Sequence, residues 1–268
     1  SSASDVYKRQ EEAPHTAGTA EERLLAFIGG KSESSLLMDA FNILLEEDIF
    51  RTNPQALEKL TGWVNARDAG RQPAAMYAMG SLLLAKDDLA GAVKMAEDGL
   101  SKYPQSLPVQ TLSLNTITTL LDKNRVEDAE RLISKYPGTS PGLVFQQGAL
   151  AFRKGDYPLA QSLFREAARR ASEKTAESAL FNENLAALNA NDAAGAAALV
   201  KEAAGSAQLR EHILFEQAHY AAKRMNPQAP ELLASFVALA TDPALKTQAR
   251  LDQAEVALNL NPPDLETV

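Results

Sequence analysis

A helical pattern that recurs about every 34 residues constrains this chain more than any other feature. In its clearest copy, the small residues Gly148, Ala160 and Ala167 alternate with large apolar residues at helical spacing. Gly155 and Asp156 mark a turn between two helices. A two-helix unit of this kind cannot bury its apolar face alone, so we expect successive copies to stack. The period-two alternation typical of strands is missing, which favours an all-α fold.

The same register recurs along the chain. Successive copies carry alanines spaced by 37, 31 and 36 residues, namely Ala92, Ala129, Ala160 and Ala196. The scatter falls in the turns, where insertions cost little. On these residues the chain resembles the tetratricopeptide repeat family, whose pattern has small residues where the paired helices cross, an aromatic residue in the second helix and a proline after it. The likeness is good over residues 76–104 and 144–167 and weaker over 111–136 and 180–203, where Asn184 replaces a small residue.

The resemblance implies a right-handed superhelical solenoid of antiparallel helix pairs. We expect this organisation along the chain: a disordered stretch at 11–19, N-terminal helices or a degenerate repeat at 20–72, the repeats at 73–207, C-terminal helices or a degenerate repeat at 208–262, and a tail at 263–268. Start and stop signals predict these helices outside the best copies: 20–28, 36–50 after Ser34 and Ser35, 54–67 after Asn53, 172–190, 192–203, 209–224, 230–240 and 243–260.

Residues 1–10 resemble translated DNA rather than a natural terminus. The segment from Asp5 to Gln10 back-translates to the end of a transposon adapter used in short-read sequencing. We therefore exclude it from fold arguments and expect its deletion to leave stability unchanged. Such a scar predicts that the true N-terminus of the gene product is missing, so that a signal, an anchor or a catalytic domain could precede Glu11. It also favours a bacterial source, with a cytoplasmic or periplasmic location.

Composition excludes several classes of partner and chemistry. The chain has 35 acidic and 27 basic residues, a net charge of −8, and no stripe of Lys and Arg with interleaved aromatic residues, so nucleic acid is not expected as a partner. With no cysteine, it can form neither disulfides nor thiolate metal sites. Residues 103–121 carry no charge, but their prolines and amides make insertion into a membrane unfavourable. We expect no cofactor and no metal.

Three short motifs suggest chemistry, and a structural explanation is preferred for each. The string Gly138-Thr-Ser140-Pro-Gly142 matches a serine hydrolase motif, but no strand precedes it, which favours a turn between repeats. Gly30-Lys31-Ser32 lacks the upstream glycine of a phosphate-binding loop, since Leu25 stands there. One helix face carries His212, Glu216 and His219, which could share a metal but are more typical of a solvated face. The chain is therefore expected not to be an enzyme.

The resemblance also implies a binding surface, because the first helix of each tetratricopeptide pair lines the concave face. The family pattern places these residues there: Tyr77, Leu84, Leu114, Asn115, Phe145, Gln146, Phe152, Arg153, Phe181 and Asn182, together with Ala78, Leu121 and Leu188. Aromatic rings would anchor a ligand, and amides would pair with an extended peptide backbone. The alternative is that these apolar side chains pack between repeats.

We therefore expect a non-enzymatic scaffold that holds a peptide segment or a partner subunit in its concave groove, of the kind that serves bacterial envelope or complex assembly. The alternative is the helical regulatory region of a larger enzyme or signalling protein whose N-terminal domain is missing. The DNA upstream of Glu11 would distinguish the two, because it would encode a signal peptide, a catalytic domain or a start codon.

Overall fold

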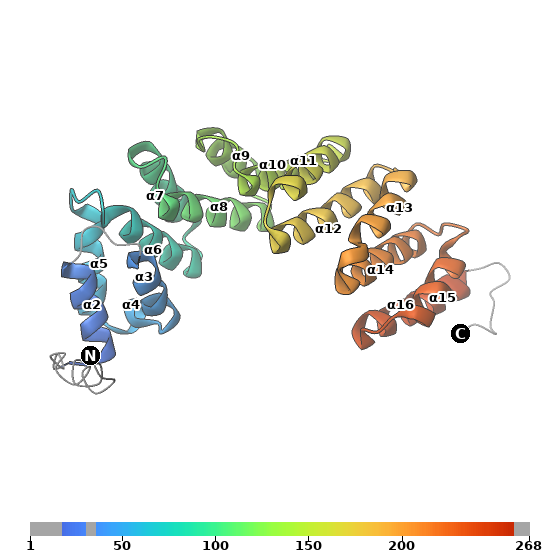
Figure 1. Ribbon diagram of the computed structural model, residues 1–268, viewed down its shortest axis with the longest axis horizontal. Coiled ribbons are helices and arrows are strands. Elements are labelled where there is room, and N and C mark those ends of the chain that lie inside the picture. Colours follow the sequence, from blue (N-terminus) through green and yellow to red (C-terminus); the bar gives the residue numbers. More distant parts are fainter. Residues whose placement is uncertain (1–17, 31–35, 260–268) are drawn as a thin grey trace, which may run out of the picture. The chain divides into compact units, whose positions relative to one another are not determined.

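The protein is all-α in its computed structural model, which describes residues 18–30 and 36–259. These residues form fifteen α-helices, α2 to α16, and one 3-10 turn, and they contain no strand. The helices pack mainly on their neighbours in the sequence, in consecutive pairs (Figure 1). This arrangement is consistent with a helical repeat, and it follows from the apolar period of the sequence.

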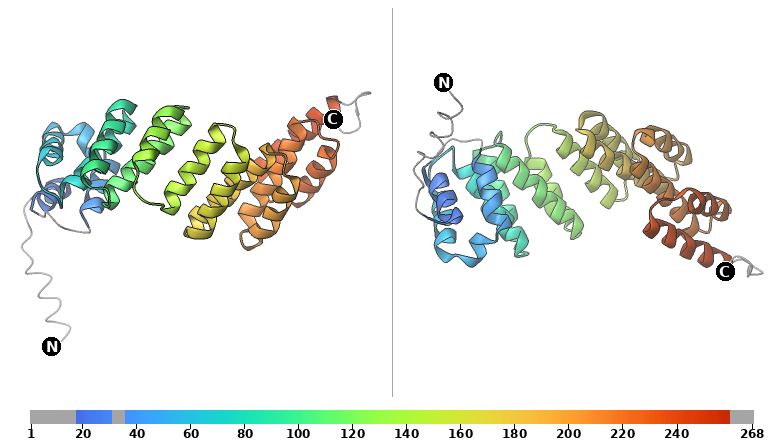
Figure 2. Two further views of the ribbon diagram at one scale, coloured as in Figure 1. Left: turned by 90° about the horizontal axis from the view of Figure 1, so that it is seen from above. Right: turned by 60° about the horizontal axis from the view of Figure 1, so that its bottom comes forward.

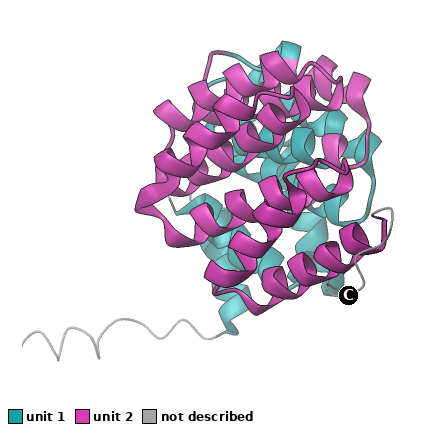
Figure 3. Ribbon diagram, turned by 90° about the vertical axis from the view of Figure 1, so that its right-hand side faces the viewer, with its two compact units in different colours: residues 1–119, 134–137 teal, residues 120–133, 138–268 magenta. Residues whose placement is uncertain are grey.

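The chain divides into two compact units (Figure 3). The first comprises residues 1–119 and 134–137 and the second the remainder. The helices of the first unit are α2 (Ala20–Gly30), α3 (Leu37–Glu46), α4 (Ile49–Thr52), α5 (Pro54–Asn65), α6 (Gln72–Ala85), α7 (Leu89–Lys102) and most of α8 (Leu107–Asp122). Its core includes Phe41, Phe50 and Leu60, and the Trp63 ring meets the Phe41 ring edge-on with centroids 5.8 Å apart.

The second unit contains one of the two clearest copies of the repeat pattern, at residues 144–167. Its helices are most of α9 (Val126–Lys135), α10 (Pro141–Arg153), α11 (Tyr157–Arg170), α12 (Glu173–Asn189), α13 (Ala193–Glu202), the 3-10 turn η1 (Ala203–Gly205), α14 (Ala207–Lys223), α15 (Ala229–Leu239) and α16 (Pro243–Asn259). Each first helix packs on its own partner, as α10 does on α11, and the first helices α10, α12 and α14 contact one another in turn. Both views of Figure 2 show these helices as neighbours.

A turn of one kind joins the two helices of successive pairs. It contains one residue in the left-handed region, at Asp87, Asn124, Gly155 and Asn191, with φ between 56° and 79°. These residues are spaced by 37, 31 and 36, the same intervals as the alanines of the pattern. Aspartate, asparagine and glycine adopt this conformation most readily. In three of the four turns the next residue is an aspartate whose carboxylate accepts a backbone N–H of the second helix and caps it.

The small residues of the pattern lie where helices approach closely. Ala160 and Ala167 are fully buried. A Cβ at Gly148 on α10 would lie 2.9 Å from the Phe164 ring on α11, and one at Gly80 on α6 would lie 2.3 Å from Leu112 on α8. Only glycine permits these approaches, which explains the small residues of the sequence pattern.

Most predicted helix bounds in the C-terminal third agree with the structure to within two residues, but the helix predicted over residues 36–50 is wrong. It is interrupted after Glu46, because Asp48 takes the left-handed conformation with φ 58° and α4 begins after it. The predicted start at Asn53 is confirmed, since its side chain accepts the N–H groups of Gln55 and Ala56. Several predictions concern residues that the structure does not describe. They are the predictions for residues 1–10 and 11–17, for Lys31 and Ser32, for the Ser34–Ser35 cap, and for the 263–268 tail.

Across residues 18–30 and 36–259, none of the helices combines the length and the apolar character that crossing a bilayer requires.

Candidate functional site

A hollow of about 360 Å³ lies between the first helices α12 and α14, and it includes two of the predicted site residues. Phe181 and Asn182 follow Glu177 and Ser178 by four positions on α12, and residues three and four apart share a helix face. The remaining lining residues are Lys174, Glu177 and Ser178 of α12 and Gln208, Leu209 and His212 of α14. The hollow therefore combines the Phe181 and His212 rings with amides and two opposite charges.

The aromatic wall of this hollow is a pair of rings from the two helices. The Phe181 ring meets the His212 ring edge-on, with centroids 6.5 Å apart and planes 87° apart. Phe181 is half-buried and packs against the core cluster that includes Leu199 and Ile213. The Nδ1–H of His212 donates to the Gln208 carbonyl at 2.9 Å, because a carbonyl oxygen can only accept. One edge of the phenylalanine is thus fixed by packing while the other stays accessible.

Some of the polar groups beside the rings form hydrogen bonds within their own helix. Asn182 Nδ2 donates to the Ser178 carbonyl at 2.8 Å, and Ser178 Oγ donates to the Lys174 carbonyl at 3.2 Å. In the described part of the chain, Asn182 Oδ1 accepts no hydrogen bond, and Lys174 and Glu177 form no ion pair. A ligand at this hollow would meet an acceptor oxygen, a cation and an anion next to an aromatic ring.

The aromatic residues predicted on α10 are half-buried rather than fully covered. The Phe145 ring lies edge-on to the fully buried Phe164 ring, with centroids 5.3 Å apart. The Phe152 ring meets the Tyr157 ring in the same way at 5.2 Å. The sequence left two roles open for these rings, packing between helices and exposure in a groove. Each ring has part of both, because it packs on the second helix of its pair and still keeps an exposed part.

The polar residues predicted on α10 differ in their exposure. Arg153 is exposed, with its guanidinium 3.8 Å from the Asp122 carboxylate. Gln146 is buried, with 8% of its surface exposed, because α10 packs against both α11 and α12. The expectation that the Gln146 amide lies on an open surface, where it could pair with a peptide backbone, is therefore wrong.

The four remaining predicted residues, Tyr77, Leu84, Leu114 and Asn115, lie in the first unit. The Tyr77 hydroxyl on α6 donates to Asn42 Oδ1 on α3 at 2.9 Å. Leu84 and Leu114 are half-buried and Asn115 is exposed. Tyr77 thus acts in part as a link between helices, a role that the sequence pattern did not indicate.

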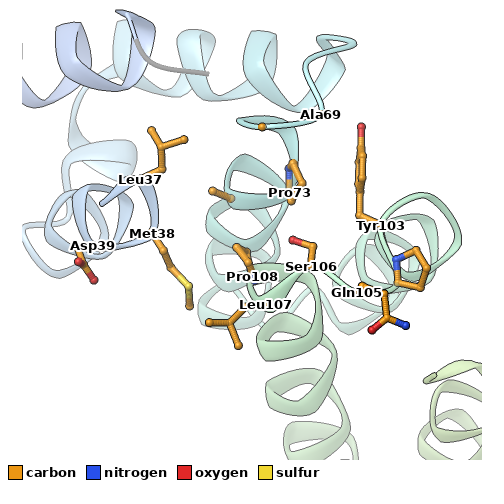
Figure 4. Close-up of a pocket in the computed structure, with 13 residues that line it drawn as sticks. Leu37, Met38, Asp39, Ala69, Pro73, Tyr103, Gln105, Ser106, Leu107 and Pro108 are labelled. Atoms are coloured by element: carbon orange, nitrogen blue, oxygen red, sulfur yellow. The ribbon is translucent and has the colours of Figure 1, made fainter. Parts of the chain in front are cut away.

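The sequence pattern missed a larger hollow of about 630 Å³ in the first unit (Figure 4). It lies at the N-terminal ends of α3, α6 and α8, and Leu37, Pro73, Tyr103 and Pro108 form its walls. The Tyr103 hydroxyl donates to Gln72 Oε1, and this hydrogen bond fixes the orientation of the ring. Among the described residues that line the hollow there is no cation and one anion, Asp39. The helix stop at Tyr103 was visible in the sequence, but the gap between three helix ends was not.

Two of the three motifs weighed in the sequence, those at Ser140 and at the histidines, lie within the described residues. Ser140 caps α10, and its hydroxyl oxygen accepts the Leu143 N–H at 3.2 Å. His219 pairs with the buried carboxylate of Asp252 at 2.6 Å, whereas His212 lies beside Phe181. No group of three metal-ligating side chains occurs within the described ranges.

Comparison with known proteins adds no relative: no family model matches the chain, and no curated protein is significantly similar to it.

Proposed function

We propose that the chain is a non-enzymatic interaction module of the tetratricopeptide type, a right-handed superhelical solenoid that binds an extended segment of a partner protein along its first helices. The observation that carries this proposal is the hollow between α12 and α14, where the predicted residues Phe181 and Asn182 lie side by side at an accessible surface. The remaining support comes from the repeat pattern and from the chemistry of the hollow.

The repeat pattern supports the family assignment through burial at its defining positions. In the copy that begins on α10, the positions taken by Gly148, Ala160, Phe164 and Ala167 are all buried. In the copy on α12, Asn184 occupies the place of the small residue and is fully buried. Its Oδ1 accepts Gln217 Nε2 of α14 at 2.9 Å, so a hydrogen bond between first helices satisfies the oxygen, whereas its buried Nδ2 has no partner among the described residues.

The chemistry of the hollow suits an extended peptide better than a reaction. A half-buried phenylalanine that is already held by its neighbours loses little entropy when a ligand covers it. Asn182 Oδ1 can accept a backbone N–H regardless of the ligand's sequence, since every residue but proline supplies one. Lys174 and Glu177 carry opposite charges, and each would favour a peptide side chain of the complementary charge beside it.

The test begins with selection of binding peptides from a random library displayed on phage against the whole chain. The affinity of a selected peptide is then measured for the parent, for Phe181→Ala and for Leu239→Ala. We expect Phe181→Ala to weaken binding by about 2 kcal/mol or more, the usual cost of losing an aromatic anchor. Leu239 is 72% exposed on α15 and does not line the hollow, so Leu239→Ala is the matched control.

Urea unfolding of the same variants separates binding from folding. Because Phe181 is half-buried, its truncation should cost less than the roughly 3–5 kcal/mol of a fully buried phenylalanine. Phe164→Ala, which empties a buried site, gives the full cost for comparison. Failure to select any peptide, or equal affinity for the parent and Phe181→Ala, would overturn the proposal.

A further inference from the structure

The last helix in the described part of the chain, α16, lacks the neighbours that cover the earlier first helices. The first helix α12 packs on its second helix α13 and on the next first helix α14, and α14 packs likewise on α15 and α16. In contrast, α16 packs on α14 and α15, and no helix follows it within residues 18–30 and 36–259 (Figure 1). Its buried residues Ala249 and Val256 join the core cluster of these two helices, so its opposite side is left uncovered by the described chain.

The uncovered side of α16 carries an apolar stripe with the spacing of a coiled-coil seam. At alternating intervals of three and four residues it contains Ala244, Thr247, Leu251, Ala254 and Leu258. These intervals are those of the a and d positions of a heptad repeat. Leu251 and Leu258 are 58% and 56% exposed, so the two largest apolar side chains of the stripe face solvent. A surface helix normally has polar residues on the side away from the core, so this stripe indicates a surface that binds another helix.

Two exposed residues of opposite charge flank the stripe. Arg250 precedes Leu251 and Glu255 follows Ala254, so they occupy a g and an e position on the two sides of the seam. In a parallel pair of helices, a g residue lies beside the e residue five positions further along the partner, which is the separation between Arg250 and Glu255. In an antiparallel pair, g positions meet g positions and e positions meet e positions, which would bring like charges together.

We infer that this stripe is a dimer interface, in which α16 packs on α16 of a second copy of the chain, parallel and in register. Leu251 and Leu258 then each meet their own equivalents across the twofold axis, and an Arg250–Glu255 ion pair forms on each side. A second copy is chosen over an unrelated helix because the charge pattern is complementary to itself. Since α16 is already folded on α14 and α15, association does not have to order it.

Sedimentation equilibrium of the full chain tests whether it dimerises. The seam is shorter than a standard protein interface, so we expect a reversible dimer with a dissociation constant between about 1 µM and 1 mM. Leu251→Gln should weaken the dimer at least about tenfold, because it removes one leucine of the seam from each copy. Leu159→Gln makes the same change at a 48% exposed leucine of α11 and should leave dimerisation unchanged.

The orientation of the two copies can be determined with disulfides, because the chain has no cysteine of its own. In a parallel, in-register seam, Leu258→Cys and Ala244→Cys should each give a covalent dimer on mild oxidation, since equivalent a positions face one another. An antiparallel seam would instead link the two variants in a mixture, because these positions lie about 21 Å apart along the helix. Leu159→Cys gives the background rate of linkage by collision.

A charge exchange tests the ion pairs without altering the apolar stripe. Arg250→Glu and Glu255→Arg should each weaken the dimer by roughly two- to fivefold or more, the scale of exposed ion pairs, because each homodimer then brings like charges together. An equal mixture of the two variants restores both pairs in the heterodimer and should recover the parent's affinity. Glu255 also accepts from Lys223 of its own chain at 2.6 Å, so Lys223→Gln is the control, and it should not weaken dimerisation.

A chain that stays monomeric up to millimolar concentration, a dimer that Leu251→Gln does not weaken, or disulfides only between unlike cysteine positions would each overturn the inference. So would a monomeric parent whose truncation after Asn259 dimerises, because residues 260–268 would then be the segment that covers the stripe. The peptide selection at Phe181 uses α12 and α14, so its outcome is separate from this one.

Discussion

His219 on α14 holds the buried carboxylate of Asp252 on α16, with Nδ1 2.6 Å from Oδ2. Asp252 is only 1% exposed, and its other oxygen accepts Gln248 Nε2 at 3.2 Å. The His219 ring also stacks on the Phe215 ring, with centroids 5.5 Å apart and planes at 21°. The polar pair thus attaches α16, the last described helix, to α14, and the stack within α14 orients the His219 ring.

Removal of His219 should destabilise the C-terminal helices. His219→Ala leaves a buried carboxylate with only the Gln248 amide, and we expect a loss of about 1–3 kcal/mol in the free energy of unfolding. His212→Ala is the matched control, because that ring lies at the surface of the Phe181 hollow and holds no carboxylate. Urea unfolding followed by circular dichroism measures both. Equal midpoints for the two variants would show that the His219–Asp252 contact contributes no stability.

One substitution should have opposite effects at two glycines. A Cβ at Gly148 would lie 2.9 Å from the buried Phe164 ring, whereas a Cβ at Gly62 in α5 would meet nothing within 4 Å. Gly148→Ala should cost about 1–3 kcal/mol through overpacking, less the helix-propensity gain of roughly 0.5–1 kcal/mol. Gly62→Ala should retain that gain alone and stabilise by roughly 0.5–1 kcal/mol. Chemical denaturation of both variants checks the signs, and a shared sign would contradict the close approach at Gly148.

The repeat register can be tested at Ala160, which is fully buried beside Phe164 and Ala186. Ala160→Leu should overpack this contact and cost about 1–3 kcal/mol. Ala194→Leu makes the same change at an exposed position of α13 and should have little effect. Unfolding of Ala160→Leu at the parent's denaturant concentration would mean that the register is wrong.

The helix pairs could be predicted from the sequence because their signals are local. Aspartate caps and left-handed turn residues act within a few positions of the chain, as at Gly155 and Asp156, and the small residue Gly148 meets Phe164 on the very next helix. The break at Asp48 was missed, because aspartate carries no strong stop signal and the apolar period continues across it.

Exposure was harder to predict than helicity, because neighbouring helices determine it. Gln146 and Asn182 occupy the same register position, yet α10 buries the first and α12 leaves the second half-exposed. The hollow of about 370 Å³ lined by Leu188, Ala196, Tyr220 and Leu232 is formed by four helices, α12 to α15, and the alanines of α13 indicate only that large side chains are missing there. Such gaps arise from the relative positions of elements distant in sequence, which a periodic pattern does not encode.

The last prediction concerns pH and Glu216, which lies on α14 one turn from both histidines. Burial raises the pKa of Glu216 above its ordinary value of 4.5, and the charges of His219 and His212 oppose this shift while Asp252 adds to it. Since the folded pKa exceeds the unfolded one, the stabilising contribution of this group is complete below about pH 4.5. It is lost as the pH rises through the folded pKa, because the side chain must then ionise where it is partly desolvated.

Glu216→Gln removes that ionisation, so the variant should unfold at a higher urea concentration than the parent near pH 7 and at a similar one near pH 4. The difference between the two proteins should therefore grow as the pH rises from about 4.5. Glu231→Gln, at an exposed position in the first turn of α15, should show no such pH-dependent difference. A stability difference between Glu216→Gln and the parent that is constant from pH 4 to 7, or that shrinks as the pH rises, would contradict the raised pKa, since only an ionisation in this window can produce the predicted slope.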